Sequence, residues 1–378
     1  MHLQQGDNMT LPVSRQEARS ASAYRSSTHC ASANNTSAYR VRRMVAILRM
    51  TPSGAMLTVL LFALLLMMAA NLFLGPVTIA PIRILEILRS GITDDADARI
   101  LLHVRLPRTL AAVLSGMALA TAGLLLQTVL HNPLAGPSLI GVNAGAGFST
   151  LLILAWFPAL YGWIPLAAFG GAMLVSLVVV GLSAATGATR IATILAGVIC
   201  SGLLNTASDA LLLLSPNSTL TTGTYLIGGF SGITAAMLRA SAPAMLLTLV
   251  LCLFIGRPLA LMGLEDDGAR TLGVPVRRTR FLLLLAASML AGGAVSLAGQ
   301  LGFVGLMVPH MVRMLPGVGR HFHIPATALL GGILVCACDL LGRLAFAPAE
   351  LPAGMLLSVL GAPFLVWLML RRKAGDRT

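Results

Sequence analysis

The stretch "RLPRTLAAVLSGMALATAGLLLQTVLHNPLAGPSLIGVNAGAG" (Arg105–Gly147) joins a long apolar run to a polar, proline-containing interruption. A helix needs roughly 20 consecutive apolar residues to cross the hydrocarbon core of a bilayer, and Leu106–Leu130 is such a run. Proline removes a backbone donor and ends or kinks a helix. We therefore predict a membrane-spanning helix that ends before His131-Asn132-Pro133, close to a membrane face where water reaches the polar groups.

Apolar runs of this kind recur along the whole chain. Of its 378 residues, 57% are hydrophobic and only 10% are charged, and the mean hydropathy is +0.87. A soluble protein can bury one such run but not a long series of them. We therefore predict an all-α, polytopic membrane protein with about ten transmembrane helices. The expected spans are Ala55–Leu74, Leu106–Leu130, Leu139–Phe157, Pro165–Leu182, Ile191–Leu214, Ala242–Gly256, Phe281–Leu297, Leu301–Leu315, Ile324–Phe346 and Pro352–Leu370.

The net charge of +13 comes from arginines that stand in short clusters between the apolar runs. The clearest clusters are Arg40, Arg42, Arg43 and Arg49; Arg270, Arg277, Arg278 and Arg280; and Arg371, Arg372 and Lys373. Such clusters are typical of cytoplasmic loops and not of a nucleic-acid-binding face. With the N-terminus inside and an even number of spans, the C-terminal cluster is also inside and the joint Pro76–Arg105 is outside. We expect a multi-pass protein of the cell inner membrane, surrounded by lipid and without a nucleic-acid partner.

Residues 1–50 differ from the remainder in composition. They are rich in Ser, Ala, Asn and Arg, and Asp7 and Glu17 are their only acidic residues. We expect a disordered cytoplasmic tail or a gene start placed too early, since Met44 and Met50 offer later starts; a transit peptide has a similar composition. Residues 51–378 form the predicted transmembrane domain.

The chain shows signs of an internal repeat. An offset of 176 residues pairs Gly116 with Gly292, Gly123 with Gly299 and Pro133 with Pro309. The paired windows stand five predicted spans apart, so they cross the membrane in opposite senses. An inverted repeat of this kind is common in transporters. We also predict that both prolines mark helix ends or breaks near a membrane face.

The sequence offers little catalytic chemistry. Lys373 is its only lysine, so a phosphate-binding Walker A loop cannot be built and ATP hydrolysis must come from another polypeptide. Cys336-Ala-Cys338 lacks metal-site spacing and is expected in the core. His310 stands alone, so a structural role is favoured over a metal or catalytic role. We expect no catalytic residue, metal or cofactor, and we predict that Asp339 pairs with Arg343 at helical spacing.

The stretch Arg105–Gly147 resembles the signature of the FecCD-type permeases, which are membrane subunits of ABC importers for ferric siderophores, haem and vitamin B12. The blocks "LGVPVRRTRFLLLLAASMLAGGAVSLAGQLGFVGLMVPHMVRM" (Leu272–Met314) and "PATALLGGILVCACDLLGRLAFAPAELPAGMLLSVLGAPFLVWLML" (Pro325–Leu370) resemble the family as well. Together they cover most of residues 100–370. The resemblance implies a ten-helix permease that dimerises around a central pathway. Two ATP-binding cassette subunits would dock inside, and a periplasmic or lipoprotein substrate-binding protein would deliver cargo from outside.

The resemblance also assigns roles to residues. Arg105, Arg108 and Arg343 would form salt bridges with acidic residues of the binding protein, as guanidinium groups suit an acidic partner; the alternative is that they snorkel at the membrane interface. Asn132, Pro133 and Leu134 would help to close the cytoplasmic gate, a role compatible with helix capping by the asparagine.

The joint Leu261–Arg280 resembles the loop that couples the permease to the ATPase, and the alternative is an ordinary solvated loop. The residues assigned to it are Glu265, Asp266, Asp267, Ala269, Arg270, Leu272 and Gly273. Its acidic run falls where the family usually has glycine followed by acidic residues, so the local turn can differ.

Two other classes compete with the importer. A membrane enzyme would need clustered His, Asp or Glu, which we do not find in the sequence. An ion-coupled secondary transporter would need acidic residues at the midplane, whereas Asp209 and Asp339 lie nearer the ends of spans. For the cargo we expect a ferric siderophore, then haem, then cobalamin, and for the partner permease a second copy of the chain in preference to a paralogue.

Overall fold

The computed structural model describes residues 52–90, 95–185, 190–214, 227–263, 268, 271–273, 275–347 and 349–375, and the described part is helical without strands. Residues 1–50, the predicted extension, lie outside it. The long helices are α2 (Pro52–Phe73), α5 (Leu106–Val129), α6 (Val142–Trp156), α7 (Ile164–Ala185), α8 (Arg190–Leu214), α10 (Ala235–Phe254), α13 (Val276–Ala298), α14 (Val304–Met314), α15 (His323–Leu344) and α16 (Ala353–Gly375). Shorter pieces are α3 (Pro81–Ser90), α4 (Ala96–Arg99), α11 (Gly256–Met262), a π-helical turn at Ile100–Arg105 and 3₁₀ turns at Pro137–Ile140, Pro158–Trp163 and Arg320–Phe322.

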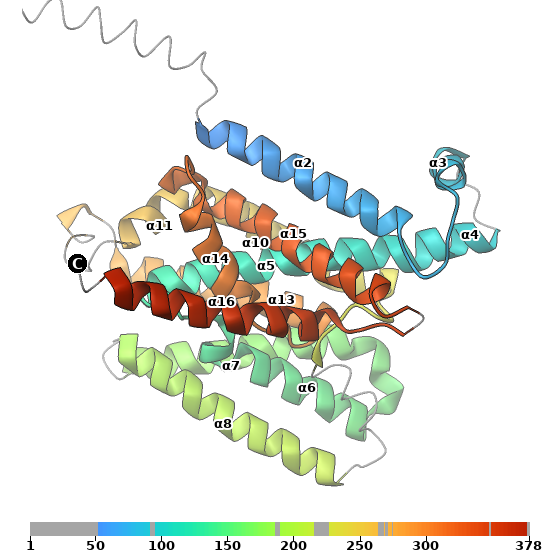
Figure 1. Ribbon diagram of the computed structural model, residues 1–378. Coiled ribbons are helices and arrows are strands. Elements are labelled where there is room, and N and C mark those ends of the chain that lie inside the picture. Colours follow the sequence, from blue (N-terminus) through green and yellow to red (C-terminus); the bar gives the residue numbers. More distant parts are fainter. Residues whose placement is uncertain are drawn as a thin grey trace, which may run out of the picture. The chain divides into compact units, whose positions relative to one another are not determined.

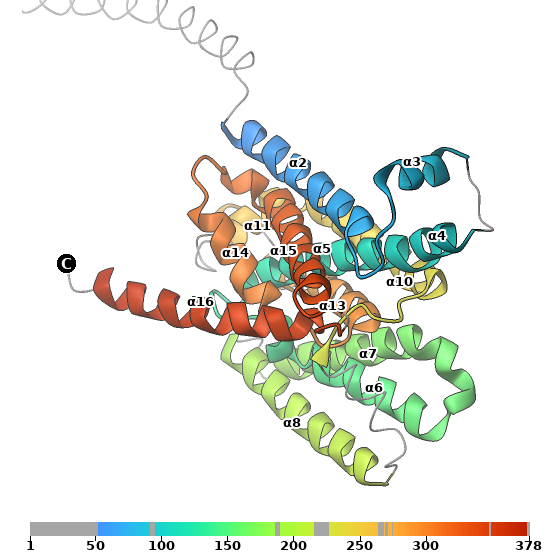
Figure 2. The ribbon, with the colours of Figure 1, turned by 45° about the vertical axis from the view of Figure 1, so that its right-hand side comes forward.

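Each predicted span overlaps one of these ten helices, and the predicted all-α membrane architecture is confirmed. Among the described residues, 7 helices are long and apolar enough to cross a bilayer, and Val142–Trp156 and Ala353–Leu368 are shorter apolar helices. Figures 1 and 2 show these helices as one bundle, with α2 along one margin and α8 along the opposite one. We call the end of α5 that begins at Leu106 the outer end and the end followed by Leu130 the inner end, according to the predicted orientation.

The predicted span Leu301–Leu315 is not a complete crossing helix. Its helical part, α14, has 11 residues, which is about 16 Å at 1.5 Å per residue and about half of the hydrocarbon thickness. The preceding residues Gly299–Phe303 are non-helical, and Leu301 among them is only 4% exposed. Backbone of this kind is tolerated at membrane depth where protein surrounds it. The chain therefore returns from α13 to α15 through a discontinuous crossing.

The prediction for the two repeat-related prolines is confirmed for one and wrong for the other. Pro133 lies in the loop after α5, whereas Pro309 lies inside α14 and the helix break comes earlier, at Gly299–Phe303. The physical reason is a substitute hydrogen bond. Pro309 cannot donate to the carbonyl of Gly305 four residues earlier, and the Nε2 group of Gln127 donates to that oxygen instead, at 3.1 Å.

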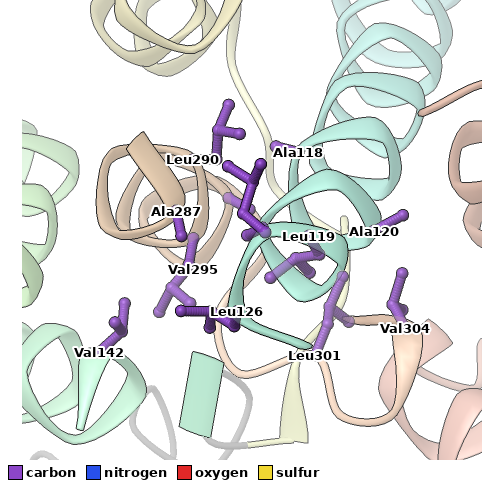
Figure 3. Packing of buried hydrophobic residues seen from close by; sticks show 14 of the residues in the cluster. Ala118, Leu119, Ala120, Leu126, Val142, Ala287, Leu290, Val295, Leu301 and Val304 are labelled. Carbon is purple, nitrogen blue, oxygen red and sulfur yellow. The ribbon is translucent and has the colours of Figure 1, made fainter. Parts of the chain in front are cut away.

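The centre of the bundle follows the predicted repeat. Helix α5 packs against α15 and α13, and α13 packs against α7 in the corresponding way. At both contacts a repeat-related glycine allows close approach: a Cβ on Gly116 would lie 2.3 Å from the carbonyl oxygen of Gly331, and one on Gly292 would lie 2.8 Å from the Cβ of Ala172. Figure 3 shows the apolar side chains that α5 and α13 contribute to the core between them.

The centre and the margins differ in burial. In an 18-residue apolar stretch of Ala96–Val129, which contains α5, 89% of the residues are buried, whereas only 17% are buried in the corresponding stretches of α2 and α8. Large apolar side chains such as Ile191, Leu203 and Leu213 of α8 are exposed. Such side chains need lipid or another protein surface as their neighbour, so the helices at the margins are where the bundle can meet lipid or a second subunit.

Candidate functional site

The structure brings the three predicted docking arginines together at the outer end. Arg105 ends the π-helical turn, Arg108 lies in the first turn of α5, and Arg343 lies in the last turn of α15. All three line one cavity of about 300 Å³, together with Glu350 from the chain between α15 and α16. We refer to Arg105, Arg108, Asp339, Arg343 and Glu350 as the arginine cluster.

Asp339 holds two of the arginines. The Nε group of Arg108 donates to both carboxylate oxygens of Asp339 at 3.1 Å, and its Nη2 group donates to Oδ1 at 2.9 Å. The predicted pairing of Asp339 with Arg343 is confirmed, with 3.3 Å between Oδ2 and Nε. Arg343 also donates through Nη2 to Oδ1 of Asn71 in α2. Because Asp339 is 1% exposed, these contacts form a buried ion-pair network at one end of the bundle.

The remaining contacts of the arginines are to backbone carbonyls and to Glu350. Arg105 donates to the backbone carbonyls of Leu72, Phe73 and Val77. The Nη1 group of Arg108 donates to Oε2 of Glu350 at 2.7 Å. Three arginines and one carboxylate, Glu350, therefore line the cavity, while Asp339 is buried behind them and Asp97 acts electrostatically on Arg105. Guanidinium groups that line a cavity suit an additional anionic group.

The arginines are less accessible than a docking surface would suggest. Arg105 and Arg343 are 3% exposed and Arg108 is 8% exposed. This burial does not fit arginines that snorkel into water. Sequence reasoning missed Glu350 and Asn71; the signals were an acidic residue in the apolar context of "AELP" and a lone asparagine in the apolar run of α2. The docking role of the arginines stays a prediction.

The predicted gate residues form a tight exposed turn at the inner end. The Oδ1 atom of Asn132 accepts a hydrogen bond from the backbone N–H of Leu134 at 2.9 Å, and its carbonyl accepts one from Ala135 at 3.0 Å. His131, just before the turn, has a positive φ of 48°, in the region that favours a sharp change of direction. Leu134 is 40% exposed. Asn132 and Pro133 are half-buried, so the turn lies partly at the surface, and its role as a gate stays a prediction.

Gln127 connects this inner end to the discontinuous crossing. Its side chain is 4% exposed. Its Nε2 group donates to the carbonyls of Gly305 and Leu306 in α14 at 3.1 and 3.3 Å. Its Oε1 atom accepts from Nη2 of Arg313 near the end of the same helix. One amide group thus fixes α14 against α5, a link that the sequence did not reveal.

The predicted coupling loop is described only in part. Glu265, Asp266, Asp267, Ala269 and Arg270 lie outside the described residues. Leu272 is 58% exposed, and Gly273 has a φ of +80° with open space around its missing Cβ. These two residues lie between α11 and α13, so a turn precedes α13. The coupling role stays a prediction.

Side chains that could hold a metal do not gather in the described part of the chain. No group of three or more His, Cys, Asp or Glu is found there. The ring of His310 packs edge-on against Phe364, with the ring centroids 6.2 Å apart. Cys336 and Cys338 are buried in the main hydrophobic core, as predicted. His310 and the two cysteines therefore have structural surroundings.

In the described part of the chain, a helical bundle with several apolar spans, a discontinuous crossing and an inverted repeat is typical of a polytopic membrane transport protein. The chain matches the model of the FecCD transport family over residues 61–371, and it belongs to this family. It is thus a transmembrane permease of the ABC importer class, located in the cell inner membrane.

Individual relatives agree with this assignment. The chain is 36% identical to the hemin transport system permease protein HmuU of Yersinia pestis, over 74% of this chain and 86% of that protein. It is 38% identical to the Fe(3+) dicitrate transport system permease protein FecD of Escherichia coli, over 72% of this chain and 86% of that protein. A solved inward-facing structure of a metal-chelate type ABC transporter superposes with a TM-score of 0.72 at 27% identity, covering 83% of this chain and 98% of the other.

Proposed function

We propose that the chain imports a ferric siderophore through a pathway formed with a second copy of itself. The observation that carries this proposal is the family match over residues 61–371, since relatives at similar identity transport iron chelates such as ferric dicitrate and ferric enterobactin. Haem is the second candidate, because the hemin permease HmuU is 36% identical.

Energy for this transport is supplied by two separate ATP-binding subunits. The supporting feature is the lone lysine of the sequence, Lys373, which stands in the C-terminal basic cluster and follows no glycine-rich loop. A phosphate-binding loop of the Walker type requires such a lysine. The permease itself is therefore not an enzyme in this proposal, and it receives the ATPase through the loop Leu261–Arg280.

A strip of polar residues on α8 supports the proposal that two copies of the chain form the pathway. Asn205, Thr206 and Asp209 are exposed on this otherwise apolar helix. Polar and charged side chains are costly in lipid and face a water-filled space or another helix instead. A pathway between two permease copies gives this strip an aqueous neighbour, while the apolar side chains of α8 remain against lipid.

The two ends of α5 have different tasks in this mechanism. A loaded substrate-binding protein docks through acidic residues at Arg105, Arg108 and Arg343, whose guanidinium groups suit carboxylate partners. ATP binding then moves the coupling loop. Because Gln127 joins α5 to α14, a shift of α14 is transmitted to the turn Asn132–Leu134, which opens or closes the inner mouth.

Reconstitution tests this function. The chain is co-purified with its ATP-binding subunits, placed in proteoliposomes and supplied with candidate binding proteins and iron-labelled siderophores or haem. We expect uptake only when ATP, the ATP-binding subunits and one binding protein are all present. An ATP-binding subunit whose Walker lysine is replaced serves as the matched control. Uptake that persists without any ATP-binding subunit would instead identify an ion-coupled transporter.

A further inference from the structure

The arginine cluster contains two carboxylates that are held very differently. Asp339 has a side chain that is 1% exposed and contacts both Arg108 and Arg343. Glu350 has a side chain that is 32% exposed and contacts Arg108 through one oxygen atom only. Removal of a buried, multiply bonded carboxylate leaves buried charges without compensation, whereas a partly exposed single contact is weak and screened by water. Asp339 is therefore a fixed counter-ion, and Glu350 is a displaceable one.

The Glu350 side chain has an alternative contact and free space beside it. Its second contact is Ser231, whose Oγ donates to the same Oε2 atom at 3.3 Å. Ser231 also lines a separate cavity of about 280 Å³ at the outer end. The backbone beside Glu350 is anchored independently, because the N–H of Leu351 donates to the carbonyl of Gly342 at 3.1 Å. A rotation of the side chain is thus enough to release Arg108 without unfolding the segment.

We propose that Glu350 is an internal competitor that occupies the position on Arg108 which an acidic side chain of the substrate-binding protein takes over on docking. This inference rests on the proposed function, since it concerns how the arginine cluster receives its partner. The cavity of about 300 Å³ beside Arg105, Arg108 and Arg343 has room for the incoming carboxylate. Docking is then an exchange of one carboxylate for another at the Nη1 group of Arg108, while Asp339 stays in place on the other side of the guanidinium.

The exchange itself is tested without any binding protein. In the purified transporter, Glu350→Ala removes the internal carboxylate, and sodium acetate is compared with sodium chloride at equal ionic strength. Because a ligand that binds only the folded state stabilises it, we expect acetate to raise the unfolding temperature of E350A by about 2–4 °C and to leave the wild type unchanged. Glu86→Ala is the matched control, since Glu86 pairs with Arg83 on an exposed helix. Equal effects of acetate and chloride on E350A would overturn the proposal.

The competition is tested by the affinity of the whole transporter for the binding protein that supports uptake. We expect Glu350→Gln to tighten this binding about fivefold to tenfold, because the competing charge is gone. Glu350→Asp, whose shorter side chain keeps the charge but reaches Arg108 less well, should tighten it by a smaller factor. Unchanged or weaker binding in both variants overturns the competition while leaving docking intact. If no binding protein binds even the wild type, the proposed docking fails, and the acetate comparison still decides whether Arg108 accepts an external carboxylate.

Discussion

The outer and inner ends of α5 are built in opposite ways. At the outer end Arg108 is buried and shares Asp339 with Arg343. At the inner end an exposed turn is held by the side chain of Asn132. Breaking the outer network separates buried charges, which costs several kilocalories per mole of free energy. The inner turn can rearrange for much less free energy, because water replaces its exposed hydrogen bond. The outer end therefore positions the helix, and movement costs the least free energy at the inner end.

Between these ends, α5 is locked by close backbone contacts. A Cβ on Gly123 would lie 1.9 Å from the carbonyl oxygen of Gly305, and one on Gly116 would lie 2.3 Å from that of Gly331. Such contacts leave little room for a helix to bend or slide. We therefore expect α5 to move as a rigid body together with α14 and α15. Four substitutions test this division of the helix.

Asp339→Asn should have the largest effect. It leaves Arg108 and Arg343 buried with only the partly exposed Glu350 as a charge partner, so we expect a loss of about 3–5 kcal/mol of stability. Unfolding of the purified protein in detergent measures this loss. Asp209→Asn is the control, because Asp209 is exposed on α8 and its removal should change stability by less than about 0.5 kcal/mol. Equal effects of the two substitutions would show that the outer network does not hold α5.

Gly123→Ala should have the second-largest effect on stability. The added methyl group meets the backbone of Gly305, so α5 and α14 must separate, and we expect a loss of about 1–3 kcal/mol. Gly181→Ala in α7 is the matched control, since no atom lies within 4 Å of its would-be Cβ. That substitution should stabilise the helix by about 0.5–1 kcal/mol. A tolerated G123A would mean that α5 and α14 are free to shift against each other.

Gln127→Leu should lower the free energy of unfolding by about 1–3 kcal/mol. The carbonyl of Gly305 loses the Gln127 side chain as its donor, and Pro309 has no N–H group to replace that donor. Thr128→Val is the control, since the Thr128 hydroxyl bonds only within α5, to the carbonyl of Leu124. The measurement combines unfolding with ATP-driven uptake. We expect uptake to fall more in Q127L than in a Thr128→Val variant of comparable stability. A parallel fall in both variants would remove Gln127 as the link between α14 and the gate.

Asn132→Ala should have the smallest effect on stability, about 0.5 kcal/mol, because its hydrogen bond is exposed to water. Its effect on uptake should be larger than its effect on unfolding, since the turn is the element that moves. Asn132→Asp keeps the acceptor oxygen and should restore uptake. A proportional loss of stability and uptake would assign the asparagine a purely structural role.

Much of the fold could be predicted because hydrophobic length is a local property. The run Leu106–Leu130 matches α5 to within one residue, and the run Ala55–Leu74 matches α2 to within three. The discontinuous crossing at Gly299–Phe303 could not be found in this way, because nothing local in Leu301–Leu315 shows that its helix begins only at Val304. The non-helical backbone there depends on burial by neighbouring helices, which is a tertiary fact.

In the candidate site, too, local contacts could be predicted from the sequence and long-range contacts could not. The pairing of Asp339 with Arg343 was predictable because both residues stand on one helix at a spacing of four. The contacts of Arg108 with Asp339 and Glu350 join residues more than 200 positions apart in the chain. No local sequence pattern could therefore predict them. The predicted arginines do converge at one place, but their burial follows from the packing of α5 against α15 and not from their charge.

The most direct test of the two-ended account is the labelling of a cysteine at the inner turn. Leu134→Cys is made in a chain whose Cys30 and Cys200 are replaced by serine, since the other cysteines are buried, and the reconstituted transporter is treated with a membrane-impermeant maleimide. The account predicts labelling only from the side of the ATP-binding subunits, at a rate that changes when ATP is trapped, while Leu85→Cys in α3 is labelled only from the opposite side. Labelling of Leu134→Cys from the side of the binding protein, or at a rate indifferent to ATP, would contradict it.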